Sequence, residues 1–151
     1  MYRGLRPLAI SVEATIGPHP PPPIESINPP NDASVQLGGN IMLNIAYNTT
    51  VSLSARNITI YQIDGENVRM RLAISGDMSE FCLVDKDNRL VTVNVLPCTF
   101  SVPNSTYYIS IGSNFVKYNE TNEPINKLPH TSWILRTGIY YFIYLIIFFF
   151  I

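Results

Sequence analysis

Short runs in which apolar and polar residues alternate recur along most of the chain, and they predict β-strands. In residues 40–47 every second side chain is large and apolar, which is the period that a half-buried strand requires. Similar runs occupy residues 57–63, 69–74, 81–84, 90–95, 106–111 and 133–137. We expect Val91, Val93 and Val95 to face the core, and Met70, Leu72 and Ile74 to share one face of their strand. Because turn residues separate the runs at short spacing, the pattern predicts an all-β fold with little or no helix.

The turn cluster Asp85–Asn88 predicts a hairpin between the strands on either side of it. Asp and Asn favour such turns because their side chains bond to nearby backbone groups. A hairpin centred on Lys86 and Asp87 would place Cys82 opposite Val91.

The composition divides the chain into three parts. Residues 1–23 contain a dense run of prolines, which favours an extended polyproline II linker. A ligand for an SH3 or WW domain is the alternative for this segment. Residues 24–137 hold the strand-like runs, and their length suits one antiparallel β-sandwich domain. Residues 138–151 form an uncharged apolar tail.

We interpret the tail, Ile139–Ile151, first as a membrane anchor in the form of a transmembrane helix. It is shorter than the roughly 20 residues that a spanning helix needs, unless residues from Trp133 onward join it and Arg136 reaches the interface. A GPI signal would have to consume the last strand of the domain. A third interpretation is that the chain is a gene-model fragment that lacks its true start and reads into non-coding sequence. A further alternative is that it is a fragment of a larger multi-domain surface protein.

The distribution of charge excludes one class of partner. Ten Lys and Arg residues are scattered along the chain and the formal net charge is −1. A protein that binds nucleic acid concentrates basic residues on one surface. We therefore expect no nucleic acid partner, and instead neighbouring domains, surface proteins or glycans.

The titratable residues do not form the groupings that catalysis requires. His19 and His130 stand alone, without other residues at a metal-ligand spacing, and no Ser or Cys lies in a nucleophile motif. Two pairs of acids could in principle hydrolyse glycosides, but both lie in turn clusters, where carboxylates are normally solvated. These pairs are Asp77 with Glu80 and Asp85 with Asp87. We expect no enzyme, no metal and no cofactor.

Aromatic side chains offer a different function, because an exposed ring can stack on the apolar face of a sugar. The candidates for such a carbohydrate-binding platform are Tyr107, Tyr108, Phe115, Tyr118 and Trp133. Large rings are more often part of a core, and we expect this for Tyr107, Phe115 and Trp133. Exposed rings on one face would favour a carbohydrate or cell-wall binding module.

Four Asn-x-Ser/Thr sequons indicate passage through a secretory compartment. They begin at Asn48, Asn57, Asn104 and Asn119. About two would arise by chance from typical composition, and the position of Asn57 at the start of a strand could block its use. We expect the protein at the cell surface, in a membrane or secreted. Without a signal sequence upstream it would be cytosolic, because residues 1–16 make a poor signal peptide.

Cys82 and Cys98 are compatible with one disulfide or with two buried thiols. A bridge in an oxidising compartment would close a loop of about 15 residues and stabilise the fold by roughly 3 kcal/mol. The predicted hairpin directs Cys82 away from Cys98, so a bridge requires the chain to bend back near Pro97. The sequence leaves both states open.

Read together, several stretches between residues 24 and 137 resemble the SbsA-type (bacterial-type) Ig-like domain. They are PPIESINPPNDASVQLGGNIMLNIAY, NITIYQIDG, LVTVNV, PNSTYYISIGSNFVK and the closing SWILRT, with Trp133 and Thr137 at the family's terminal positions. The resemblance implies an Ig-like antiparallel β-sandwich that acts as a non-catalytic spacer or adhesion module at a cell surface. It implies no particular ligand.

Overall fold

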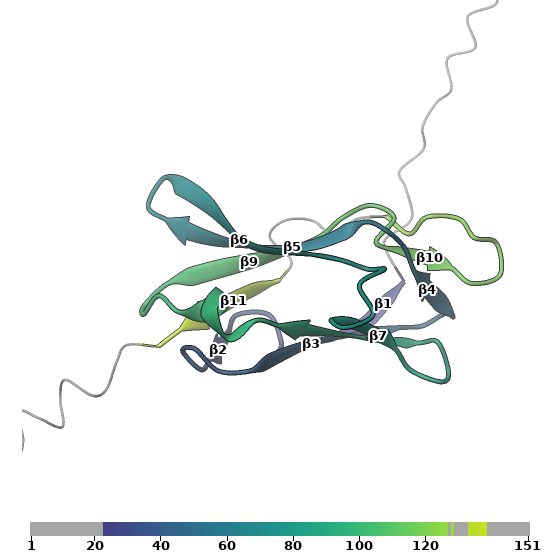
Figure 1. Cartoon of the computed structure of the whole chain (residues 1–151), viewed down its shortest axis with the longest axis horizontal. Coiled ribbons are helices and arrows are strands. Elements are labelled where there is room, and N and C mark those ends of the chain that lie inside the picture. The colour runs from purple at the N-terminus through teal and green to yellow at the C-terminus, as the bar shows by residue number, and fades with distance from the viewer. Residues whose placement is uncertain (1–22, 127, 129–132, 139–151) are drawn as a thin grey trace, which may run out of the picture.

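The structure is a computed structural model that describes residues 23–126, 128 and 133–138. These residues form two main β-sheets that face each other across a common core, with a small third sheet at one end (Figure 1). The prediction of an all-β sandwich is therefore confirmed. The sandwich extends along one axis, and the described segment enters it at β1 and leaves it after β11.

One main sheet has four strands in the order β1-β3-β8-β7, and all of its pairs are antiparallel. Its strands are β1 (Ile24–Asn28), β3 (Ile41–Tyr47), β8 (Leu90–Val95) and β7 (Cys82–Val84). The runs predicted at 40–47 and 90–95 form the two central strands. Their alternating apolar side chains explain this position, because a central strand buries one face completely.

The other main sheet has five strands in the order β2-β11-β9-β5-β6. They are β2 (Ala33–Val35), β11 (Ile134–Thr137), β9 (Thr106–Ile111), β5 (Asn57–Asp64) and β6 (Asn67–Ser75). The pair β2–β11 is parallel, and the other pairs are antiparallel. The third sheet pairs β4 (Val51–Leu53) with β10 (Val116–Tyr118).

The core lies between the two main sheets and contains the apolar residues that the strand patterns predicted. Val91, Val93 and Val95 are buried, as expected. The largest fully buried side chains are Trp133, Tyr47, Tyr107, Phe100, Phe115, Leu43 and Ile45. Phe100 belongs to the short 3-10 helix η1 (Pro97–Phe100), which the sequence pattern did not predict.

The prediction that Met70 shares one face with Leu72 and Ile74 is wrong, because β6 contains a bulge. Ile60 pairs with Leu72, whereas the next residue, Tyr61, pairs with Met70, so that Arg71 is the extra residue. An extra residue reverses the side on which the following positions lie. Leu72 therefore faces inward, while Met70 lies on the outer face and is 65% exposed.

The predicted hairpin between β7 and β8 is present, but its register differs from the prediction. Cys82 pairs with Val93 and Val84 pairs with Val91. The turn is closed by the bond from the Asp85 amide to the Leu90 carbonyl, which moves its centre toward Asn88. The prediction that Cys82 lies opposite Val91 is therefore wrong.

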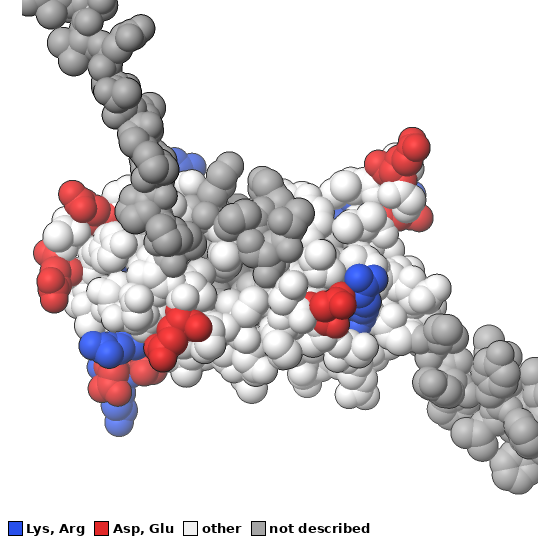
Figure 2. Space-filling model, turned by 180° about the vertical axis from the view of Figure 1, so that it is seen from behind, with Lys and Arg blue, Asp and Glu red and all other residues white. Residues whose placement is uncertain are grey.

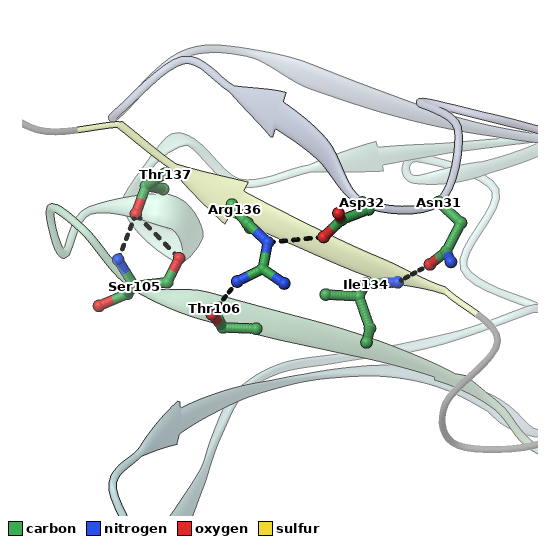
Figure 3. Close-up of polar contacts among 7 residues, drawn as sticks. All are labelled: Asn31, Asp32, Ser105, Thr106, Ile134, Arg136 and Thr137. Atoms are coloured by element: carbon green, nitrogen blue, oxygen red, sulfur yellow. Dashed lines mark hydrogen bonds and ion pairs between the residues drawn. The ribbon is translucent and has the colours of Figure 1, made fainter.

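Polar contacts fasten β11 on both sides (Figure 3). The Thr137 hydroxyl accepts a bond from the Ser105 amide (3.0 Å) and also bonds to the Val102 carbonyl (2.6 Å). On the other side, the Arg136 guanidinium donates to the Asp32 carboxylate (2.6 Å). The indole of Trp133 donates to the carbonyl of Pro29 (2.9 Å). Residues 133–137 therefore close the sandwich by joining the first turn to the turn before β9.

The two ends of the strand-bearing region lie at opposite ends of the sandwich (Figure 1). Ile24 pairs with Tyr47, at the end of β3 that leads to β4. Near the opposite end of β3, the Asn104 amide donates to the carbonyl of Gly138, directly after β11. Within the described residues, no helix is long and apolar enough to cross a membrane. The tail, Ile139–Ile151, lies outside the described part of the chain.

Candidate functional site

All four sequon asparagines have exposed side chains. Asn48 follows β3, Asn119 follows β10, and Asn104 lies in the turn before β9 with a positive φ of 48°. Asn57 is the first residue of β5, as predicted, and the strand does not bury it. Each position therefore has room for a glycan, and whether glycans are attached stays a prediction.

A groove of about 660 Å³ lies on the outer face of the five-stranded sheet, and Asn57 is one of the residues that line it. The other residues that line it are Ala55, Arg56, Thr59, Tyr61, Ser110, Gly112, Ser113, Asn114 and Pro124. Most of these carry hydroxyl or amide groups, and Arg56 is the one charged residue among them. Such a surface suits a neutral ligand rich in hydroxyl groups.

The floor of the groove consists of small residues on neighbouring strands. Thr59 on β5 pairs with Ser110 on β9, and both point outward. Gly112 follows β9, and its amide donates to the Asn57 carbonyl (3.0 Å). A Cβ atom on Gly112 would come within 2.8 Å of that carbonyl oxygen, so a larger residue would displace the start of β5.

The groove is also lined by Tyr61, which forms an aromatic pair with Tyr108 across β5 and β9. The rings of Tyr61 and Tyr108 stack with centroids 4.8 Å apart and an angle of 16° between their planes. Burial and the neighbouring Tyr61 raise the pKa of Tyr108. Tyr61 was not among the aromatic residues predicted as a binding platform, although its spacing of two and four residues from Thr59 and Asn57 places all three on one face of the strand.

The other candidate aromatic residues form no platform. Tyr107, Phe115 and Trp133 are fully buried, so the expectation that they belong to the core is confirmed. Tyr108 and Tyr118 are partly exposed on different sheets. Tyr118 lines a separate hollow of about 200 Å³ beside the sequons of Asn48 and Asn119.

The candidate acids lie in turns rather than in a cleft. Asp77 and Glu80 are exposed between β6 and β7. Asp85 accepts bonds from the backbone amides of Arg89 (2.8 Å) and Leu90 (2.9 Å). The bonds from Leu90 and Arg89 lower the pKa of Asp85 because they stabilise its carboxylate form. Asp85 therefore holds the β7–β8 turn in shape, and Asp87 is exposed in the same turn.

The two cysteines are free thiols in different environments. Cys82 is buried on β7, and its Sγ donates weakly to the Ser75 carbonyl (3.5 Å). Burial, with a smaller effect of Asp77, raises the pKa of Cys82 to about 11. Cys98 is exposed in η1. The disulfide that the sequence left open is not formed in this structure.

The described residues contain no group of three His, Cys, Asp or Glu side chains that could hold a metal ion. His19 and His130 lie outside the described part of the chain. On the face shown in Figure 2, charged side chains lie in small separate groups with uncharged surface between them.

Comparison with known proteins gives little to add to this geometry. No family model matches the chain, and no curated protein matches it. A solved structure of murine CRIg is similar over 78% of this chain and 97% of its own chain, at 10% sequence identity and a TM-score of 0.35. A likeness this weak carries no argument about function. The resemblance to SbsA-type domains stays a prediction.

Proposed function

We propose that this chain is a non-catalytic Ig-like module with a structural or adhesive role in a cell-surface or secreted protein. The observation that carries the proposal is the complete burial of Tyr107, Phe115 and Trp133. A carbohydrate-binding platform would keep such rings at the surface, where they can stack on sugars. Their burial supports a module whose aromatic residues stabilise the fold.

The order of the strands supports the Ig-like assignment. The orders β1-β3-β8-β7 and β11-β9-β5 correspond to the A-B-E-D and G-F-C orders of immunoglobulin sandwiches. Tyr107 lies near the start of β9, the strand in the F position, and its hydroxyl donates to the Val102 carbonyl (3.4 Å) and accepts from the Val102 amide (3.3 Å). Immunoglobulin sandwiches contain the same contact as a tyrosine corner.

The resemblance to SbsA-type domains extends the proposal to a place in an array of domains at a cell surface. The two ends of the domain lie at opposite ends of the sandwich, which suits such an array because successive modules would be joined end to end. Partners would be neighbouring domains, surface proteins or glycans. Anchoring through Ile139–Ile151 is part of the same proposal. Since one fold supports many functions, the adhesive role is argued by analogy.

A second candidate is a carbohydrate or cell-wall binding module, and the groove beside Tyr61 is the observation that favours it. Sedimentation of the chain with insoluble polysaccharides would distinguish the two functions. Binding that is lost in Tyr61→Ala would favour the second candidate.

The proposed function is tested by expressing the full chain with its own termini in a eukaryotic cell that has a secretory pathway. Exposed sequons in a protein that enters the lumen receive glycans, so we expect an electrophoretic mobility shift on treatment with a peptide N-glycosidase. A variant with Gln at Asn48, Asn57, Asn104 and Asn119 is the control and should show no shift. If the unaltered chain also shows no shift, the surface role fails for this chain.

A further inference from the structure

The strand β5 carries a sequon and an aromatic residue on the same outward face. Ile58 and Ile60 are buried, so the alternation of a strand directs Asn57, Thr59 and Tyr61 to the opposite side. Four residues of extended chain separate Asn57 from Tyr61, a distance of about 13 Å. The first two sugar rings of an N-linked glycan span such a distance.

The groove provides a surface along the whole of this path. Its lining includes Asn57, Thr59 and Tyr61 of β5, and also Ser110, which pairs with Thr59. The Tyr61 ring is held in place by stacking on Tyr108. Sugars are neutral, carry many hydroxyl groups and present an apolar C–H face, and the groove offers hydroxyl and amide groups together with an aromatic ring.

We propose that Asn57 carries an N-linked glycan whose first sugar rings lie in this groove and pack against Tyr61. The inference rests on the proposed function, because the glycan requires entry into the secretory pathway. The Asn57 side-chain nitrogen displaces the diphosphate of a lipid-linked oligosaccharide at the anomeric carbon. A C–N bond forms, the C–O bond to the diphosphate breaks, and the amide loses a proton.

This glycan would change the surface of the domain in a defined way. Without it, Tyr61 is partly exposed beside its cross-strand partner Met70, which is 65% exposed. With it, the groove is filled by a permanent ligand and is closed to other carbohydrates. The carbohydrate-binding candidate and this inference therefore make opposite predictions for the same groove.

The experiment uses the full chain produced in secretory-competent eukaryotic cells, and mass spectrometry of glycopeptides gives the occupancy of each sequon. We expect Asn57 to be occupied. An endoglycosidase that cleaves between the first two sugars is then applied to the folded protein. We expect trimming at Asn57 to be several-fold slower than at Asn104, which is exposed and does not line the groove. After denaturation the two rates should be equal.

Variants of Tyr61 show whether slow trimming at Asn57 depends on packing of the glycan in the groove or on general shielding by the protein. Tyr61→Ala should raise the trimming rate at Asn57 to that at Asn104. Tyr61→Val, which keeps a strand-forming residue, should do the same and guards against a folding defect. Met70→Ala removes an exposed side chain from the same face outside the groove and should leave the slow rate unchanged.

The outcomes distinguish this inference from the proposed function. Occupied sequons at Asn104 or elsewhere with an empty Asn57 would overturn the inference and leave the proposed function intact. A chain with no glycan at any sequon would overturn both. An occupied Asn57 that is trimmed as fast as Asn104 would mean that the glycan extends into solvent, which also contradicts the inference.

Discussion

At the residue scale, the hydroxyl of Thr137 stabilises a contact between parts of the chain that are distant in sequence. Its side chain is 4% exposed and bonds to backbone groups of Val102 and Ser105. Thr137→Val keeps the shape but leaves the Ser105 amide without this acceptor and the Val102 carbonyl with only its bond from Tyr107. We expect a loss of about 1–3 kcal/mol in the free energy of unfolding, measured by urea denaturation of unglycosylated protein.

Thr106→Val is the matched control for this substitution. The Thr106 hydroxyl accepts a bond from the exposed Arg136 (3.3 Å) on the outer face, where water can replace it. The expected change is within about 0.5 kcal/mol. Equal effects of the two substitutions would contradict the role given to Thr137.

The two thiols differ enough at this scale to be told apart by labelling. Cys98 is exposed, whereas Cys82 is 3% exposed and its pKa of about 11 keeps it in the unreactive thiol form. In the folded protein at pH 7.5, a maleimide should label Cys98 rapidly and Cys82 only after denaturant is added. Peptide mapping identifies the labelled residue. Labelling of neither thiol before reduction would instead indicate a disulfide.

At the scale of elements, the β7–β8 hairpin depends on the carboxylate of Asp85. Its pKa is lowered in the folded state, so its stabilising contribution is complete above the unfolded pKa of about 4 and is lost as pH falls through the folded value. We expect Asp85→Asn to be less stable than the unaltered chain at pH 7, and the difference to shrink toward pH 2.

Thermal unfolding of both proteins across this pH range measures the effect of Asp85. Glu80→Gln removes an exposed carboxylate from the preceding turn and controls for the loss of one charge. A difference between Asp85→Asn and the unaltered chain that stays constant with pH would mean that the bonds to Arg89 and Leu90 do not depend on ionisation.

Comparison of elements also explains how much of the fold the sequence could predict. The strands β3, β5, β8 and β9 were predictable because each buries one face and so alternates along its length. The strands β2, β4 and β10 have three residues each, too few to establish a period. The bulge at Arg71 was also not predictable, because its cause is the pairing with β5 and not the local pattern.

For the whole molecule, the candidate site was less predictable than the fold. The sequons could be found from the sequence, and so could the absence of a recognisable catalytic motif. The groove could not, because it requires Asn57 on β5 to lie beside Gly112 after β9. These residues are distant in sequence and come together only when the strands pair.

The parallel pairing of β2 with β11 determines how the whole domain would bear mechanical tension. Force applied at Ile24 and Thr137 pulls β2 and β11 in opposite directions along their common axis, because the two ends lie at opposite ends of the sandwich. The backbone bonds of this strand pair, whose register runs from Ala33 opposite Leu135 to Val35 opposite Thr137, would then be loaded together in shear and could not open one after another. A module built in this way would resist extension, which is the property that the proposed structural or adhesive role at a cell surface requires.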